Sequence, residues 1–243
     1  MKVVRAIQTF WGLFIFNFLF AVLFPFLLIP IFFPKQHHLT GIFNRWWAKL
    51  MFRFVFIPYD VVERARLDRG KQYIFCANHF SYLDIPTMGL NPINTVFVGK
   101  NDMERVPLFG FMYRKLHITV NRESFRSRGN SMVTAMKAID EGKSLAIFPE
   151  GGMLSERAPQ MIAFKDGAFR VAIEKRVPVV PVSIPFNWTI LPDRWPMRLQ
   201  KGRARIVFHE PIDTFGMSLD DVGRLKSQTF QIIEAELKQQ NAL

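Results

Sequence analysis

A long uncharged stretch at the beginning of the chain constrains its fold more than any other feature of the sequence. Residues 6–34 contain no Lys, Arg, Asp or Glu, and residues 10–33 are almost wholly apolar. About 20 such residues suffice to cross the hydrocarbon core of a bilayer. The stretch is too long for a signal peptide, and no small-x-small cleavage site follows it. We therefore expect a permanent membrane segment.

Two features of this segment favour a structure that enters the membrane and returns over one that spans it. Lys2 and Arg5 precede the segment and further basic residues follow it, so the charges define no clear cytoplasmic end. Pro25 and Pro30 are expected to interrupt a straight helix near its end. A single span and a buried helix of a soluble core are the alternatives.

Apolar residues recur at helical spacing over residues 39–55, with Trp46 and Trp47 among them and basic residues on the other face. This pattern predicts an amphipathic helix at the lipid headgroup boundary. A helix packed on a protein core is the alternative. We predict that residues 1–57 form a two-helix membrane anchor and that residues 58–243 form a single globular domain.

Short apolar runs alternate with helical patterns through the rest of the chain. This alternation predicts an α/β fold with a mixed, largely parallel sheet flanked by helices. Strands are expected at about residues 73–77, 95–99, 118–120, 145–148, 179–184 and 205–208, and helices from about residue 81 and at about 131–141, 163–175 and 218–238.

The charge and the aromatic residues of the chain point to a lipid surface. The net charge of +12 attracts polyanions such as nucleic acid, an anionic leaflet or a phosphorylated ligand. The densest basic run (Arg122, Arg126, Arg128) lies apart from the aromatic residues, which concentrate in the N-terminal segment. Nucleic-acid surfaces place the two together. We therefore predict membrane lipids, and not nucleic acid, as partners.

The single cysteine allows no intrachain disulfide. Cys76 lies in an apolar run that reads as a strand, where an unpaired cysteine is usually a buried and unreactive core residue. A nucleophile assisted by His79 is the alternative. No Cys/His cluster indicates a metal, and no Gly-rich loop indicates a nucleotide, so we expect no cofactor.

Residues 78–84 (Asn-His-Phe-Ser-Tyr-Leu-Asp) are the clearest candidates for chemistry. The predicted strand delivers His79 to a turn, and Asp84 follows in the first turn of a helix, so its carboxylate can fold back onto the imidazole. Such a pair resembles a catalytic triad whose nucleophile, for instance an alcohol, comes from the substrate. Ser81 and Asp84 fit an ordinary capping box equally well, so the segment alone leaves both interpretations open.

Five motifs in order over residues 78–182 resemble those of the 1-acyl-sn-glycerol-3-phosphate acyltransferase family of glycerophospholipid acyltransferases. They are N-H-x-S-x-x-D at 78–84, a loose match to G-x-I-F-x-x-R at 116–122, F-P-E-G at 148–151, F-K-x-G-A-F at 164–169 and V-P-x-x-P-V at 177–182. The resemblance implies transfer of a fatty-acyl chain from acyl-CoA or acyl carrier protein to the sn-2 hydroxyl of 1-acyl-glycerol-3-phosphate, which makes phosphatidic acid. Glycerol-3-phosphate or another lysolipid as acceptor, and a non-catalytic lipid-binding protein, are the alternatives.

The resemblance also implies a mechanism and a location. His79 would be the general base for the acceptor hydroxyl, and Asp84 would orient it. Backbone N–H groups near a helix start would stabilise the oxyanion. The active site would face the cytoplasm, from which the thioester donor arrives, at a bacterial inner membrane.

Residues that contact the acceptor are implied less firmly. Lys100 and Arg122 would bind its phosphate, and Glu150 and Gly151 would shape its site. Family members often continue F-P-E-G with Thr-Arg-Ser, whereas residues 152–155 here read Gly-Met-Leu-Ser. The arginine is missing, which leaves the contact with the acceptor headgroup open.

Overall fold

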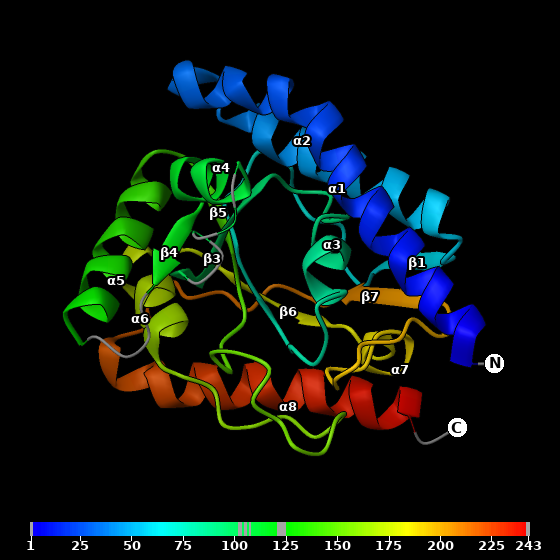
Figure 1. Cartoon of the computed structure of the whole chain (residues 1–243). Helices are drawn as coiled ribbons and strands as arrows, with labels where there is room; N and C mark the ends of the chain where they lie inside the picture. Colours follow the sequence, from blue (N-terminus) through cyan, green and yellow to red (C-terminus); the bar gives the residue numbers. More distant parts are fainter. Residues whose placement is uncertain (1, 102–103, 105, 107, 121–124, 242–243) are drawn as a thin grey trace.

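The structure is a computed structural model that describes residues 2–101, 104, 106, 108–120 and 125–241, with the backbone alone at residues 2, 100 and 125–128. Two N-terminal helices lie along one side of an α/β core, and the long C-terminal helix lies on the opposite side (Figure 1). The predicted fold class is therefore confirmed.

One seven-stranded sheet forms the centre of this core, in the order β1-β7-β6-β2-β5-β3-β4. Every neighbouring pair is parallel except β6 and β7, which are antiparallel. The strands are β1 (Tyr59–Glu63), β2 (Ile74–Ala77), β3 (Thr95–Lys100), β4 (Ile118–Val120), β5 (Ser144–Ile147), β6 (Val179–Ser183) and β7 (Ala204–Phe208).

Helices cover both faces of the sheet. They are α1 (Lys2–Phe32), α2 (His38–Val55), α3 (Asp84–Met88), α4 (Phe109–Leu116), α5 (Phe125–Asp140), α6 (Gly167–Lys175), α7 (Asn187–Ile190) and α8 (Val222–Asn241), with 3-10 turns η1 (Pro34–Gln36) and η3 (Leu219–Asp221). The sequence did not predict β1, α4 or α7. β1 is an edge strand that contains charged residues and stays partly exposed, and α7 spans only four residues.

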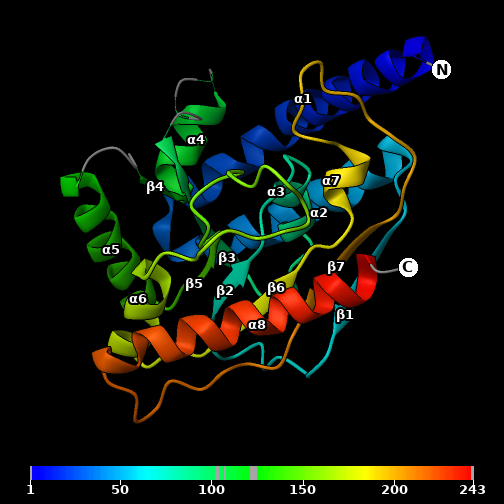
Figure 2. The ribbon, with the colours of Figure 1, turned by 90° about the horizontal axis from the view of Figure 1, so that it is seen from below.

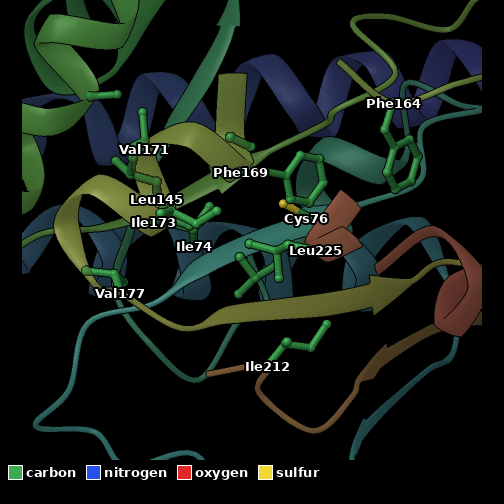
Figure 3. Close-up of a cluster of buried hydrophobic side chains, with 14 of the residues drawn as sticks. Ile74, Cys76, Leu145, Phe164, Phe169, Val171, Ile173, Val177, Ile212 and Leu225 are labelled. Carbon is green, nitrogen blue, oxygen red and sulfur yellow. The ribbon is translucent and has the colours of Figure 1, made fainter. Parts of the chain in front are cut away.

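Alternate residues of the central strands pack on opposite faces, as strand geometry requires. In β2, Phe75 and Ala77 lie in the cluster on the α3 side, whereas Ile74 and Cys76 lie in the cluster beneath α5, α6 and α8. Figure 3 shows the Cys76 sulfur among Phe169 and Leu225. Burial raises the pKa of the Cys76 thiol well above its ordinary value, which confirms a core residue rather than a nucleophile.

The first helix is continuous through both of its prolines, so the prediction that Pro25 and Pro30 interrupt it is wrong. Proline within a helix costs about 3 kcal/mol, and the extensive packing of α1 on α2 offsets that cost. At 1.5 Å per residue, the 31 residues of α1 span about 46 Å. The part Val3–Phe32 is long and apolar enough to cross a membrane, and most of its side chains face outward from the protein. Figure 2 shows its N-terminal end projecting beyond the core.

The second helix turns most of its apolar side toward protein. Ala48, Met51 and Phe52 are buried between α1 and the core, and the Trp47 ring packs edge-on against Phe16 of α1 at 4.8 Å between centroids. Trp46 instead is 60% exposed. The two adjacent tryptophans, predicted to share a lipid-facing surface, therefore have different environments.

Candidate active site

The turn after β2 is held in place by the residue before the histidine. Asn78 is fully buried, and its amide donates to the Ile184 carbonyl at 3.0 Å and accepts from the Ile184 N–H at 2.8 Å. This paired contact fixes the end of β2 against the end of β6. His79 then leaves the sheet at the carboxyl end of the parallel strands, where ligand sites of open α/β sheets occur.

His79 and Asp84 are brought together as predicted. The Nδ1 atom of His79 lies 3.0 Å from Oδ2 of Asp84, and both side chains are buried. An aspartate that accepts from Nδ1–H leaves Nε2 without a proton and able to accept one. The Phe148 ring stacks on the imidazole at 4.1 Å between centroids, with 19° between the planes. The ring plane of the histidine is thus fixed from its face as well as from its edge.

The hydrogen bonds around Asp84 explain why its charge is tolerated at 1% exposure. Oδ2 also accepts from the N–H groups of Phe80 (2.8 Å) and Ser81 (2.9 Å). The capping-box alternative therefore holds in part, because Asp84 satisfies the N–H of Ser81 while it also binds His79. The same bonds occupy the N–H groups just before α3, so these two donors are not free to stabilise an oxyanion.

Asn187, at the start of α7, completes this environment and was not predicted. Its side-chain N–H groups donate to Oδ1 of Asp84 at 2.9 Å and to the Thr87 hydroxyl at 2.8 Å. The residue is fully buried and lies 103 positions away from Asp84 in sequence. No signal in the local sequence marks it, apart from its place four residues after the end of β6.

Glu150 links the turn that carries His79 to the loop after β5. One carboxylate oxygen accepts from the His79 N–H at 2.8 Å, and the other accepts from the Ile162 N–H at 3.1 Å. Burial raises the pKa of this carboxyl to about 7, the two backbone donors oppose the rise, and the charge of Asp84 adds to it. Glu150 has no exposed surface, so it positions the backbone of His79 rather than facing an acceptor.

A cavity of about 990 Å³ extends from His79 to the two N-terminal helices. Its walls are mostly apolar, and they include Phe16 and Phe20 of α1, Trp47 of α2 and Phe148 behind the imidazole. A volume of this size lies at the upper end of the range for ligand pockets. The histidine therefore opens onto a space that can hold a long apolar chain.

The other predicted site residues have different placements. Gly151 lines the cavity in a left-handed conformation, with φ +84°. Lys100 ends β3, where its backbone pairs with Val120, and its neighbour Gly99 lines the cavity. The side chain of Lys100 and the whole of Arg122 lie outside the described residues.

A second histidine on the cavity wall has a different character. The Nδ1 atom of His117 accepts from the Phe97 N–H at 3.2 Å, and burial lowers the pKa of the imidazole to about 4. His117 therefore remains neutral at physiological pH. No carboxylate contacts its ring among the described residues, which separates it chemically from His79.

Comparison by sequence and comparison by fold both find acyltransferases among the proteins similar to this chain. A family model described as acyltransferase matches residues 59–185. The 1-acyl-sn-glycerol-3-phosphate acyltransferase of Haemophilus influenzae is 31% identical over an alignment of 209 residues, which covers 82% of this chain and 81% of that protein. A lyso-ornithine lipid O-acyltransferase of Pseudomonas aeruginosa is 26% identical over an alignment of 219 residues, which covers 82% of this chain and 79% of that protein.

Several other curated relatives are longer, and the chain spans between 49% and 63% of their length. The crystal structure of the 1-acyl-sn-glycerophosphate acyltransferase from Thermotoga maritima has the same fold, with a TM-score of 0.80 at 22% identity. The match covers 100% of this chain and 98% of that one. The shared fold includes the two N-terminal helices.

Proposed function

This chain belongs to the acyltransferase family and is an O-acyltransferase, and from that premise we propose that it acylates the sn-2 hydroxyl of 1-acyl-glycerol-3-phosphate to make phosphatidic acid. The donor is an acyl thioester, either acyl-CoA or acyl carrier protein. The observation that carries the proposal is the buried His79–Asp84 pair at the wall of a large apolar cavity.

The reaction follows from the free nitrogen of His79. Nε2 takes the proton of the acceptor hydroxyl as its oxygen attacks the thioester carbonyl carbon. The C–O bond forms, the tetrahedral intermediate collapses and the C–S bond breaks. The imidazolium then returns its proton to the leaving thiolate. Asp84 remains ionised throughout, because it accepts hydrogen bonds at both oxygens and stabilises the transient imidazolium.

The membrane supplies the acceptor and the apolar chains. The outward apolar face of α1 would lie in lipid, and the cavity between α1, α2 and His79 would receive an acyl chain directly from the bilayer. The soluble donor would then approach from the cytoplasmic side. This arrangement needs no bound cofactor.

Two observations favour a second acceptor class. The loop after Gly151 carries Met153 where the resembled family often has an arginine, and one relative is named for a lyso-ornithine lipid. A hydroxyl-bearing amino-acid lysolipid is therefore the alternative acceptor, with the same chemistry at His79.

The test is acyl transfer by detergent-purified protein, comparing wild type with His79→Ala and with His38→Ala, an exposed histidine remote from the pair. Both thioester donors are offered with 1-acyl-glycerol-3-phosphate, glycerol-3-phosphate and lyso-ornithine lipid. We expect phosphatidic acid from wild type and His38→Ala, and about 10²- to 10⁴-fold less from His79→Ala. Equal rates for wild type and His79→Ala would show that His79 is not the general base. If wild type acylates only another acceptor, that acceptor replaces 1-acyl-glycerol-3-phosphate as the substrate.

A further inference from the structure

Lys165 reaches back over the glycine turn that follows β5. Its N–H donates to the Pro149 carbonyl at 2.9 Å, which fixes the lysine beside that turn. Its side chain then passes over Gly151, where an added Cβ would collide with Nζ and Cε of the lysine. Both residues lie on the wall of the cavity that contains His79. The missing side chain at position 151 thus makes room for the lysine.

The charge of Lys165 stands out in this apolar cavity. Among the described lining residues it is the one Lys or Arg, and Asp193 is the one carboxylate. None of the ion pairs formed within the described part of the chain involves Lys165. The nearby Glu150 carboxylate is committed to two backbone N–H groups. The ammonium is therefore available to a ligand.

The loop after Gly151 brings no other positive charge to the cavity. Gly152, Met153 and Leu154 line it, whereas Arg157 is not among the described lining residues. An ammonium on a wall of this kind attracts an anionic group, and phosphate is a strong partner for it. Lys165 and the Phe148 ring that stacks on His79 both line this cavity.

We propose that Lys165 binds the phosphate of the acyl acceptor and so positions the acceptor hydroxyl at His79. This inference rests on the proposed function and deepens it. In a 1-acyl-glycerol-3-phosphate, only two carbons and an ester oxygen separate the sn-2 hydroxyl from the phosphorus. A phosphate held at Lys165 therefore restricts where that hydroxyl can lie. An acceptor without the phosphate gains nothing from the contact.

The experiment compares Lys165→Met, which keeps an apolar stem over Gly151, with Arg170→Met, an exposed cation on α6 that does not line the cavity. A hydrogen bond to a charged group contributes about 1.5–3 kcal/mol, so Lys165→Met should raise KM for the phosphate acceptor by about 10- to 100-fold. Arg170→Met should not raise it. Lys165→Arg should restore most of the loss. Activity on a monoacylglycerol, which has no phosphate, should be equal in wild type and Lys165→Met.

Inorganic phosphate is a second probe that does not depend on turnover of the uncharged acceptor. It should compete with the acceptor in wild type, and its inhibition constant should rise in Lys165→Met. An unchanged KM, or an equal loss on the charged and uncharged acceptors, overturns the role of Lys165 while wild-type phosphatidic acid synthesis stands. A wild type that makes no phosphatidic acid overturns the proposed function itself. Unfolding temperatures of all variants exclude a folding defect.

Discussion

Asp84 accepts more hydrogen bonds than its pairing with His79 requires. Three donors converge on Oδ2, and among the described residues Asn187 supplies the side-chain bond to Oδ1. A buried carboxylate without such donors would become protonated or would leave the site. The surroundings of Asp84 therefore keep it charged and orient it for the histidine. The donors are an imidazole, two backbone N–H groups and a side-chain amide, so the effect of the amide can be tested separately by mutation.

Asn187→Ala removes the donor to Oδ1 and should lower kcat by about 10-fold or more, given about 1.5–3 kcal/mol for a hydrogen bond to a charged group. Without the Asn187 donor, less of the negative charge on Asp84 is compensated by hydrogen bonds, so the carboxylate attracts the imidazolium more strongly. The acid limb of the pH–kcat profile should therefore move to higher pH. The measurement is kcat against pH for both proteins.

Thr87→Val is the matched control, because it removes the other partner of Asn187 and leaves the bond to Asp84 intact. It should reduce stability but leave the acid limb where wild type has it. Identical profiles for Asn187→Ala and wild type would reduce Asn187 to a packing residue.

At this scale the contact between His79 and Asp84 could be predicted from the sequence, whereas the residues that hold the pair in place could not. His79 and Asp84 are five residues apart, so local geometry predicts their contact. Asn187 donates across 103 positions and Asn78 bonds across 106, and such contacts depend on how β2 and β6 lie in the sheet. Glu150 was predicted near the site, but its bonds to backbone became apparent only with the loop conformation.

At the scale of elements, Glu150 joins the ends of two neighbouring strands. It follows β5 and binds the N–H of His79 after β2, so its protonation state affects how the two strand ends are held. Because burial raises its pKa from the ordinary 4.5 to about 7, the folded protein binds this proton more tightly than the unfolded chain. The stabilisation that comes from the protonated Glu150 is then complete below about pH 4.5 and is lost as the pH rises to about 7.

We predict that Glu150→Gln lacks this pH dependence. Relative to the variant, wild type should lose about 3 kcal/mol of unfolding free energy between pH 4.5 and 7.5, at 1.36 kcal/mol per pKa unit. The measurement is denaturant unfolding in a fixed detergent across that range. Glu156→Gln, an exposed carboxylate in the same loop, should follow wild type. Parallel curves for wild type and Glu150→Gln would show that the buried carboxyl titrates normally.

Elements were predicted where burial is continuous and missed where it is not. β2, β5 and β6 are almost fully buried, and their apolar runs mark them within about one residue. β1 is half exposed at the edge of the sheet, and two of its five residues, Asp60 and Glu63, are charged, so its sequence resembles that of a loop. The two prolines of α1 predicted an interruption that does not occur. The helix continues through them because packing on α2 overrides the local propensity.

At the scale of the whole molecule, the N-terminal helices complete the cavity as well as offering an apolar surface. Residues of both α1 and α2 line the space in front of His79. Arg45 of α2 fixes this arrangement by donating to the carbonyls of Asn91 and Pro92 at 2.8 and 2.9 Å. A shift of these helices would therefore alter the cavity in front of His79.

The different environments of the two tryptophans allow these roles to be separated. Trp46→Glu places a charge on an exposed side of α2 and should weaken binding to anionic liposomes while the unfolding temperature stays near that of wild type. Trp47→Glu places a charge against Phe16 in the apolar cavity and should lower the unfolding temperature instead. Phe215→Glu, 78% exposed in the segment between β7 and η3, is the control for charge. Liposome flotation and thermal unfolding of the three variants measure the two effects. If Trp46→Glu floats as wild type does, α1 alone carries the attachment, and α2 serves to build the cavity.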